Sequence, residues 1–522
     1  MREQDWSSSV NLFDYLVARH VRGQRGAATA LLYEDAELTY ADLADSVLRM
    51  ATVLRMHGCT RGDHVVLLLP DTPTFVSVFF AAMHIGAVAV PVNPALAYED
   101  VAHIADHTRA VLVVVDAAFA EKFRGLPDPG RRLLTAGDGH ACCADLERAV
   151  GAAERDATES AQVEDAIAYC LFSSGTTGVP KGIPHRHSDI LACITAYSVP
   201  VLHMSSEDRV LAVPKLTFGY GLGGNLLSSL FVGAASILVA SASSAASMIA
   251  AAERYSPTLF LGQPRLLADL LRSDSLDAFR RLRLAVSAGE VLVDTLYRRW
   301  RELVGCELLD GFGSTEVGHV FITNRVGDIR PACAGRVVDG FSVRFTNETG
   351  EPVPAGVAGE MWVQGPSMAR GYSNDPERTK RHFVDGWVRT GDLAYRDEAG
   401  YIYVCGRADD MIKAGCGQWV SPTEIEAVIA DDPAIAECAV VGYSDALGVV
   451  RPKAYIVLRQ GVRPCAEVEE RLKVAVANRF DELPHKHIDA VEFVSSLPRG
   501  ATGKLQRFRL KPATLTEFSY QC

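Results

Sequence analysis

Residues 171–182 read Leu171-Phe172-Ser173-Ser174-Gly175-Thr176-Thr177-Gly178-Val179-Pro180-Lys181-Gly182, directly after the apolar segment 166–170. That apolar segment is typical of the end of a buried strand. Glycines let the backbone approach an anion closely, hydroxyls and successive N–H groups can bind it, and Lys181 supplies a positive charge. Ordinary surface loops also have this composition, but its density behind a strand favours a phosphate-binding loop. It is not the Walker loop, because Pro180 and Gly182 stand where that motif needs a glycine and a hydroxyl.

Length and composition predict an ordinary globular protein with two or more domains. The chain has 522 residues, of which 48% are hydrophobic and 22% charged. A formal net charge of −12 disfavours a nucleic acid as partner, since a duplex-binding protein needs a basic face. The sequence shows neither a signal peptide nor a membrane span, and its 12 cysteines are scattered rather than grouped. We therefore expect a cytoplasmic protein with free thiols and no membrane partner.

Strand and helix patterns alternate along the first part of the chain. The expected elements are a helix capped by Thr39 that runs to Met56, a strand at 65–69, a helix at 75–85, and strands at 86–92 and 111–115. This alternation predicts an α/β fold with mainly parallel sheets flanked by helices. In such sheets binding loops lie at strand ends, which is where the opening motif stands.

Two further loops follow apolar runs in the same way. Ser287-Ala288-Gly289-Glu290 follows 282–286, and Asp310-Gly311-Phe312-Gly313-Ser314-Thr315-Glu316 follows Leu308-Leu309. Small residues allow close approach of a nucleotide, hydroxyls can bind phosphate, and Glu316 can bind Mg²⁺. A turn with an N-capping hydroxyl is the alternative for the second loop. Beside the first motif, a nucleotide site is the better interpretation.

Two other patterns suggest sites that we do not expect. Gly219-Tyr220-Gly221-Leu222-Gly223-Gly224 matches the dinucleotide fingerprint, but no acidic residue follows until Glu253. His185 and His187 have the chemistry of zinc ligands, but no cysteine or third histidine stands nearby at ligand spacing.

The last third of the chain changes character. Residues 335–363 predict a small β-rich region, and the segment after Asp410 predicts a small α+β unit with a helix start at Ser421, strands at 438–441 and 454–458, and a helix at 466–478. Asp392 and Arg407 form a candidate ion pair, although a buried carboxylate also suits ribose hydroxyls. Lys504 lies on a Gly-flanked loop, where a lysine is usually just solvated.

Taken in order, these motifs resemble those of the adenylate-forming superfamily, which contains acyl- and aryl-CoA ligases, adenylation domains and luciferases. The likeness extends from about Leu38 to Leu510. It implies an acid–thiol ligase that uses ATP and Mg²⁺ to form acyl-AMP with release of pyrophosphate, and then forms a thioester with coenzyme A. It also implies an ATP- and acyl-binding domain over 1–408, a small mobile α+β domain over 409–522 that rotates between the two steps, and a hinge at Asp409.

The resemblance assigns roles residue by residue. The implied catalytic residues are Lys504, Glu316, Thr177 and Lys181, with Glu316 also the metal ligand. The implied ATP-binding residues are Ser173, Ser174, Gly175, Thr176, Thr177, Gly178, Lys181, Ser287, Gly289, Glu290, Asp310, Gly311, Phe312, Gly313, Thr315, Asp392 and Arg407. The implied acid-binding residues are Lys215, Phe218, Gly219, Tyr220, Gly221, Gly313, Gly318 and His319, and the implied thiol channel holds Lys413, Gly415 and Gly417.

Within the superfamily, 215–223 and 318–325 look most like the benzoate-CoA ligases. An apolar slot formed by Phe218, Tyr220 and His319 suits an aromatic ring, although the alternative that these side chains are only core stays open. Gly219 and Gly318 stand where bulkier residues are expected, which suggests a substituted or extended aryl acid rather than benzoate.

The acceptor and the oligomeric state stay open. The stretch 413–422 looks one residue longer than the usual loop, so the alternative is an enzyme that loads an aryl acid onto the phosphopantetheine of a separate carrier protein. A third reading is a non-catalytic binding homologue, against which the intact Lys504, Glu316, Asp392 and Lys181 argue. The sequence does not decide between a monomer and a homodimer.

Overall fold

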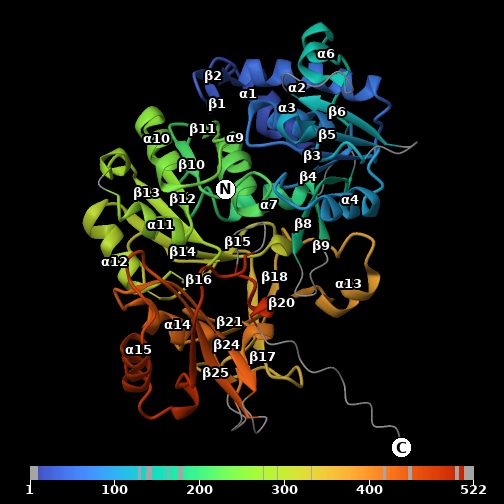
Figure 1. Ribbon diagram of the computed structural model, residues 1–522. Coiled ribbons are helices and arrows are strands. Elements are labelled where there is room, and N and C mark those ends of the chain that lie inside the picture. The colour runs from blue at the N-terminus through green and yellow to red at the C-terminus, as the bar shows by residue number, and fades with distance from the viewer. Residues whose placement is uncertain are drawn as a thin grey trace, which may run out of the picture. The chain divides into compact units, whose positions relative to one another are not determined.

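The computed structural model describes residues 10–126, 131–136, 144–161, 164–174, 180–273, 275–290, 292–330, 332–414, 419–444, 449–499 and 505–510 (Figure 1). The chain divides into two compact units. The first unit contains 1–344, 362–390 and 399–402, and the second contains 345–361, 391–398 and 403–522.

The α-helices are α1 (Arg19–Arg22), α2 (Tyr40–Met56), α3 (Pro73–His84), α4 (Tyr98–His107), α5 (Ala117–Ala120), α6 (Leu146–Ala152), α7 (His187–Ala196), α8 (Gly219–Gly221), α9 (Ser228–Val232), α10 (Ala245–Tyr255), α11 (Pro264–Leu270), α12 (Asp294–Leu303), α13 (Pro376–His382), α14 (Pro422–Ala430) and α15 (Ala466–Arg479). The strands are β1 (Thr29–Tyr33), β2 (Ala36–Thr39), β3 (His64–Leu68), β4 (Val88–Pro91), β5 (Leu112–Asp116), β6 (Arg132–Ala136), β7 (Ala144–Asp145), β8 (Ile167–Ser174), β9 (Pro180–Arg186), β10 (Arg209–Ala212), β11 (Ala235–Ile237), β12 (Leu259–Gly262), β13 (Leu284–Ala288), β14 (Glu307–Gly313), β15 (Val320–Thr323), β16 (Arg336–Val337), β17 (Ser342–Thr346), β18 (Gly359–Gln364), β19 (Phe383–Val384), β20 (Trp387–Arg396), β21 (Ile402–Arg407), β22 (Ile412–Lys413), β23 (Trp419–Val420), β24 (Ile435–Ser444), β25 (Val450–Leu458) and β26 (Ala490–Phe493).

A seven-stranded sheet in the first unit has the order β7-β6-β5-β3-β4-β8-β9. Its neighbouring strands are parallel except for the antiparallel pair β8 and β9. The central strands β3 and β5 are runs of Val and Leu, as expected for strands that are buried on both faces. The predicted strands at 65–69, 86–92 and 111–115 are confirmed.

A nine-stranded sheet in the same unit has the order β16-β15-β14-β13-β12-β10-β11-β1-β2. The strands from β14 to β1 in this order are parallel, and antiparallel strands complete both edges. Because β12, β13 and β14 run parallel, their carboxyl ends lie at one edge of the sheet, where ligand-binding loops are expected.

Helices pack on both sheets and share a central layer. One large core contains residues of β1 from the nine-stranded sheet and β3, β4 and β5 from the seven-stranded sheet, together with residues of α2, α3 and α7. A separate core joins α10, α11 and α12 to the nine-stranded sheet, and another joins α4 and α5 to the seven-stranded sheet (Figure 1). Helix α2 begins as predicted, because Thr39 and Asp42 form a reciprocal capping box.

The second unit contains a three-stranded sheet with the order β24-β25-β26, against which α14 and α15 pack. The predicted β-rich region at 335–363 contains β16, β17 and β18, of which β16 is an edge strand of the nine-stranded sheet of the first unit. The predicted helix start at Ser421 is confirmed, because Ser421 is the N-cap residue of α14, although its hydroxyl donates to the Cys405 carbonyl oxygen rather than to the helix.

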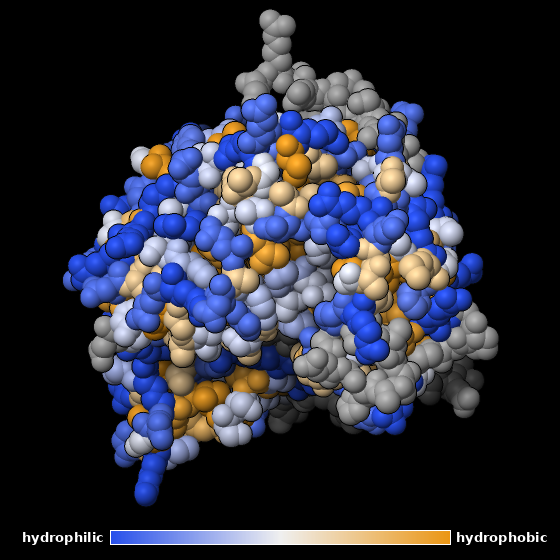
Figure 2. Space-filling model, turned by 90° about the horizontal axis from the view of Figure 1, so that it is seen from above, coloured by the Kyte–Doolittle hydropathy of each residue, from blue (hydrophilic) through white to orange (hydrophobic). Residues whose placement is uncertain are grey.

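The face drawn in Figure 2 is mostly hydrophilic, with hydrophobic residues in small groups. No helix in the described part of the chain is long and apolar enough to cross a membrane. The cysteines at the described positions are free thiols. The fold class predicted from the sequence is confirmed, whereas the boundary between 408 and 409 stays a prediction.

Candidate active site

The opening motif lies on the hairpin of β8 and β9. Ser173 pairs with Lys181 across the hairpin, and Ser174 pairs with Pro180. Strand β8 therefore continues four residues past the expected strand end at Cys170, and the motif joins two antiparallel strands. The predicted ATP ligands Gly175, Thr176, Thr177 and Gly178 lie outside the described residues, as does the side chain of Ser174.

Lys181 is held in a compact polar cluster with Glu316 and Tyr372. Its ammonium lies 2.7 Å from Glu316 Oε1 and 3.1 Å from the Tyr372 hydroxyl, which itself donates to Glu316 Oε1 at 3.0 Å. The ammonium also lies 4.7 Å from the centre of the Tyr372 ring. The side chains of Lys181 and Glu316 are only 17% and 14% exposed, so each charge depends on its partner.

This cluster determines the ionisation of Glu316. Burial alone would raise the pKa of the carboxyl, but the charge of Lys181 and the hydrogen bonds from Lys181 and Tyr372 outweigh burial and lower the pKa to about 2. Glu316 is therefore an anion at neutral pH. It begins a short 3₁₀ turn with Thr315, and the buried His185 Nε2 contacts the Thr315 carbonyl oxygen at 2.6 Å.

The carboxyl ends of β13 and β14 lie beside each other. Ser287 pairs with Asp310 and Ala288 with Gly311, which places the second and third predicted loops at one sheet edge. Three buried polar atoms in these loops have no hydrogen-bond partner in the described part of the chain: Ser287 Oγ, Asp310 Oδ1 and Ser314 Oγ. Buried polar atoms are nearly always paired, so this edge suits a polar ligand. Burial raises the pKa of the Asp310 carboxyl well above its ordinary value.

The remaining predicted nucleotide residues lie around the same edge. Gly289 has φ +92° and Glu290 is exposed. Gly313 has no room for a side chain, because a Cβ there would lie 2.3 Å from the His319 carbonyl oxygen. Phe312 is partly exposed, and its ring meets Phe321 edge to face at 5.7 Å.

Most of the predicted acid-binding residues also come together. The imidazole of His319 lies between two tyrosine rings, 5.7 Å from Tyr220 and 5.4 Å from Tyr197. Burial lowers the pKa of His319 to about 4, so the imidazole is neutral. Tyr220 and Phe218 are half-buried, and the Tyr220 hydroxyl donates to the Val286 carbonyl oxygen at 3.0 Å. The structure thus forms an aromatic cluster from the two segments that the sequence singled out.

The glycines of this cluster differ in whether a side chain could replace their hydrogen. A Cβ at Gly219 would lie at an ordinary contact distance, 3.5 Å, from the Gly318 carbonyl oxygen, so a Cβ would fit there. Gly318 has φ +89°, a conformation that favours glycine whatever the space around it. A Cβ at Gly221 would lie 2.2 Å from the Pro214 carbonyl oxygen, which excludes any side chain.

Lys215 stands apart from the other predicted acid-binding residues. Its ammonium donates to the carbonyl oxygens of Val239 at 2.5 Å and Ser241 at 2.6 Å. Its role in binding the acid therefore stays a prediction that these contacts do not support.

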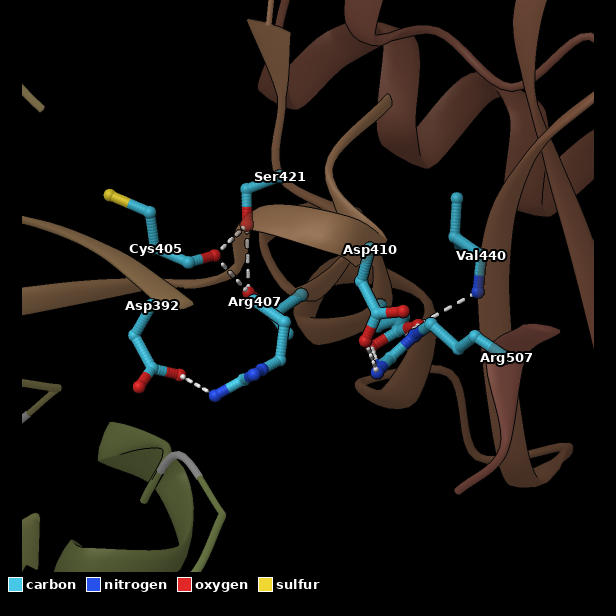
Figure 3. Close-up of polar contacts among 9 residues, drawn as sticks. Asp392, Cys405, Arg407, Asp410, Ser421, Val440 and Arg507 are labelled. Atoms are coloured by element: carbon cyan, nitrogen blue, oxygen red, sulfur yellow. Dashed lines mark hydrogen bonds and ion pairs between the residues drawn. The ribbon is translucent and has the colours of Figure 1, made fainter. Parts of the chain in front are cut away.

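The predicted residues of the second unit are partly described. Asp392 and Arg407 form an ion pair at 3.3 Å, in which the Asp392 side chain is 10% exposed (Figure 3). Next to Asp409, Asp410 forms an ion pair with Arg507 at 3.4 Å, and Arg507 also pairs with Glu426 at 2.7 Å. Lys413 is exposed on β22. Gly415, Gly417 and Lys504 lie outside the described residues.

The histidines of 185–187 are engaged in the fold. His187 Nδ1 accepts a hydrogen bond from the Leu12 amide at 3.1 Å, and His185 contacts Thr315 as described above. Among the described residues no group of three or more His, Cys, Asp or Glu side chains could bind a metal ion. A metal at this site would depend on Glu316 together with oxygens of the ligand, as is usual for Mg²⁺.

Sequence reasoning missed three members of the site: Tyr372, Tyr197 and His185. Tyr372 lies 191 residues from Lys181, and no local spacing signals that the two meet. Tyr197 follows α7 and looks like an ordinary core aromatic in the sequence. His185 was considered only as a metal ligand.

Comparison with known protein families decides the family. The model of the AMP-binding enzyme family matches residues 17–373, and that of the AMP-binding enzyme C-terminal domain matches 424–504. The chain belongs to the AMP-binding enzyme family. Both matches agree with the adenylate-forming resemblance on which the site residues were assigned.

Several relatives of this AMP-binding enzyme are named for aromatic acids. It is 36% identical over 511 residues to the benzoate–CoA ligase of Thauera aromatica, with 96% of both chains covered. It is 34% identical over 483 residues to a p-hydroxybenzoic acid–AMP ligase of Mycobacterium tuberculosis, covering 92% of this chain and 66% of that protein. The crystal structure of an anthranilate CoA ligase with anthranoyl-AMP superimposes with a TM-score of 0.91 at 32% identity, covering 98% of each chain.

Proposed function

We propose that this AMP-binding enzyme activates an aromatic carboxylic acid with ATP, forming an acyl-adenylate and pyrophosphate, and then transfers the acyl group to the thiol of coenzyme A. The observation that carries the proposal is the Lys181, Glu316 and Tyr372 cluster, which belongs to the same unit as the aromatic cluster around His319. The relatives are named for benzoate and p-hydroxybenzoic acid. An apolar slot walled by aromatic rings suits such acids.

The chemistry requires two anions to meet, because the carboxylate of the acid attacks the α-phosphorus of ATP. Charge neutralisation and positioning therefore carry most of the catalysis. Lys181 is proposed to supply positive charge to the phosphates. Thr177 and Lys504 are proposed to bind the reacting groups together with it. When bound, Mg²⁺ neutralises phosphate charge, and Glu316 is its proposed protein ligand.

Lys181 and Glu316 neutralise each other in this structure. Binding of ATP requires them to separate, since Lys181 has to face phosphate oxygens and Glu316 a cation. The Tyr372 hydroxyl contacts both groups, so it can stay hydrogen-bonded to one of them after they part. We assign Tyr372 the role of positioning the two charges.

The remaining proposed roles follow the resemblance. The unpaired Ser287, Asp310 and Ser314 atoms suit the adenine ring and the α-phosphate. Asp392 and Arg407 are the proposed ribose partners, with Asp409 as the proposed hinge. The thiol is proposed to approach along the loop that begins at Lys413.

Transfer to a carrier protein is the second candidate for the thioester step. One relative is named as an AMP ligase rather than a CoA ligase, and the stretch 413–422 looks one residue longer than the usual loop. In that case the first half-reaction is unchanged, and only the thiol that accepts the acyl group differs.

The test is a pyrophosphate-release assay across benzoates, aminobenzoates, cinnamates and aliphatic acids, each run with and without coenzyme A. We expect an aromatic acid to give the highest kcat/KM, and coenzyme A to convert the adenylate to a thioester detected by mass spectrometry. Lys181→Met should abolish pyrophosphate release, whereas Lys380→Met, at an exposed lysine, should not. Turnover of aliphatic acids alone would refute the aromatic assignment. Adenylate that accumulates despite coenzyme A, and that a phosphopantetheinylated carrier protein consumes, would favour the second candidate.

A further inference from the structure

The face of β9 that carries Lys181 also carries Ile183 and His185. Strand β9 pairs with β8 in unbroken register over this stretch, so alternate residues point to the same side. Lys181 contacts the Tyr372 hydroxyl, and Ile183 belongs to a buried apolar cluster with Ala369 and Tyr372. This face of the strand is therefore packed against the polar cluster of the candidate active site.

His185 contacts the turn that carries Glu316. It is 0% exposed, and its Nε2 lies 2.6 Å from the Thr315 carbonyl oxygen. Burial lowers the pKa of the imidazole below its ordinary value, so the ring is neutral at pH 7. Because a carbonyl oxygen can only accept, Nε2 carries the proton and donates it to this hydrogen bond. The bond thus joins β9 to the peptide group directly before Glu316.

The other two carbonyl oxygens of this turn are bound by a different segment. The Glu316 oxygen accepts from the Ala369 amide at 2.8 Å, and the Val317 oxygen accepts from the Ser367 hydroxyl at 2.6 Å. Both of these donors belong to the segment that follows β18, whereas His185 belongs to β9. Of these three contacts, that of His185 is therefore the one that joins the turn to the strand of the counterion.

The distance between the two charges of the ion pair depends on how closely β9 and the turn are held together. A charge-assisted hydrogen bond weakens when its donor and acceptor move beyond about 3.2 Å. Lys181 contacts the carboxylate of Glu316 at 2.7 Å, and His185 holds the peptide group at the other end of the same residue. Two side chains of one strand therefore fix both the carboxylate and the backbone of Glu316.

We propose that His185 is a positioning residue that holds the Glu316 carboxylate at Lys181 and in the place where it binds the Mg²⁺ that accompanies ATP. This inference rests on the proposed function, because it takes Glu316 as the protein ligand of the metal. It has one consequence for the ion pair, which can be measured without any substrate, and one for metal binding.

The first test measures the coupling free energy between Lys181→Met and Glu316→Gln by urea unfolding. His185→Leu keeps the volume but removes the donor, whereas His185→Gln places an amide N–H near the position of Nε2. The coupling should fall to roughly half in the Leu background and stay close to the wild-type value in the Gln background. The matched control is His20→Leu, because His20 is also buried and its Nε2 contacts the Leu230 carbonyl oxygen at 2.8 Å. It should lower stability without changing the coupling.

The second test measures binding by titration calorimetry in the absence of the acid, so that no turnover occurs. The dissociation constants of Mn²⁺–ATP and of ATP with EDTA are compared in the full-length enzyme, with Mn²⁺ as the probe for Mg²⁺. His185→Leu should reduce the preference for Mn²⁺–ATP by ~10-fold, because residues that orient a metal ligand affect metal affinity to this degree. His185→Gln should restore most of the preference, and His20→Leu should not change it.

The outcomes separate this proposal from the proposed function. A coupling or a Mn²⁺–ATP preference that is unchanged in His185→Leu would overturn the positioning role, as would a Gln variant as impaired as the Leu variant. His185→Asn, whose shorter side chain does not bring its amide to the Nε2 position, provides the same test if His185→Leu does not fold. A wild-type enzyme that binds neither form of ATP would instead refute the proposed function.

Discussion

The ion pair between Lys181 and Glu316 allows a quantitative prediction about stability. Both side chains are largely buried, and their charged atoms lie 2.7 Å apart. Replacing Lys181 by Met removes the charge but keeps much of the side-chain volume. Glu316 then keeps only the Tyr372 hydroxyl as a partner from this cluster, and a buried carboxylate without a counterion is costly.

The magnitude follows from the ionisation of Glu316. The lowering of its pKa from 4.5 to about 2 corresponds to roughly 3 kcal/mol in favour of the anion. Loss of one partner of a buried pair costs about 3–5 kcal/mol, so we expect Lys181→Met to lower the free energy of unfolding by about 3 kcal/mol at pH 7. A depressed carboxyl pKa stabilises the fold above the unfolded value near 4.5, and this contribution is lost as the pH falls towards 2. The difference between the two proteins should therefore shrink as the solution is acidified, because a protonated Glu316 does not need Lys181.

The assay is a double-mutant cycle measured by urea unfolding at pH 7 and at about pH 3, within the range where the contribution is lost. We expect Glu316→Gln also to cost about 3 kcal/mol, because it leaves the largely buried Lys181 ammonium without a counterion. The double variant should cost about as much as either single variant, which gives a coupling of about 3 kcal/mol. Lys380→Met at the exposed pair with Glu377 is the matched control and should have no measurable effect. Additive effects of the two single substitutions would refute the argument.

Two further predictions concern single groups. Tyr372→Phe should lower kcat/KM for ATP by ~10-fold and leave the KM for the acid unchanged, because its hydroxyl contacts Lys181 and Glu316; an equal effect on both substrates in steady-state kinetics would contradict this role. Burial raises the pKa of Asp71 to about 6, against the opposing effects of the Lys215 charge and a hydrogen bond from the Leu216 amide. A raised carboxyl pKa means that stability falls as the pH rises from about 4 to 6, so Asp71→Asn should flatten this part of the curve of unfolding free energy against pH.

Much of the fold could be predicted from local patterns. The helix α2 was indicated by Thr39 with an apolar stripe, and the parallel core strands by short runs of Val and Leu. The end of a strand was harder to predict. Strand β8 extends through polar residues as far as Ser174 because it pairs with β9. Ser421 and Pro422 indicated the start of α14, but nothing local indicated that the Ser421 hydroxyl donates to the Cys405 carbonyl oxygen of another element. Tertiary pairing overrides local preference in both cases.

The site was predictable only where its residues are neighbours in the sequence. The strand-end loops at 287–290 and 310–316 show their character in composition, and the parallel order of β13 and β14 brings them together. Tyr197 and Tyr372 carry no such signal, since their importance depends on which atoms lie opposite them in space. Lys215 shows the reverse case, because a lysine beside a glycine-rich motif suggested a ligand contact and instead donates to two backbone carbonyl oxygens.

The charges proposed to bind ATP also stabilise this part of the fold. Lys181 and Glu316 carry the charges proposed to bind phosphate and a cation, and at their low exposure each charge is stabilised by the other. ATP that binds these charges must therefore replace the contacts that lower the pKa of Glu316 to about 2. Tyr372 lowers that cost, because a hydroxyl that already contacts both groups can remain bonded to one after they separate. By this argument a protein with a weaker Lys181–Glu316 pair would bind ATP more readily but would be less stable. Tyr372 allows the protein to combine a stable fold with ATP binding.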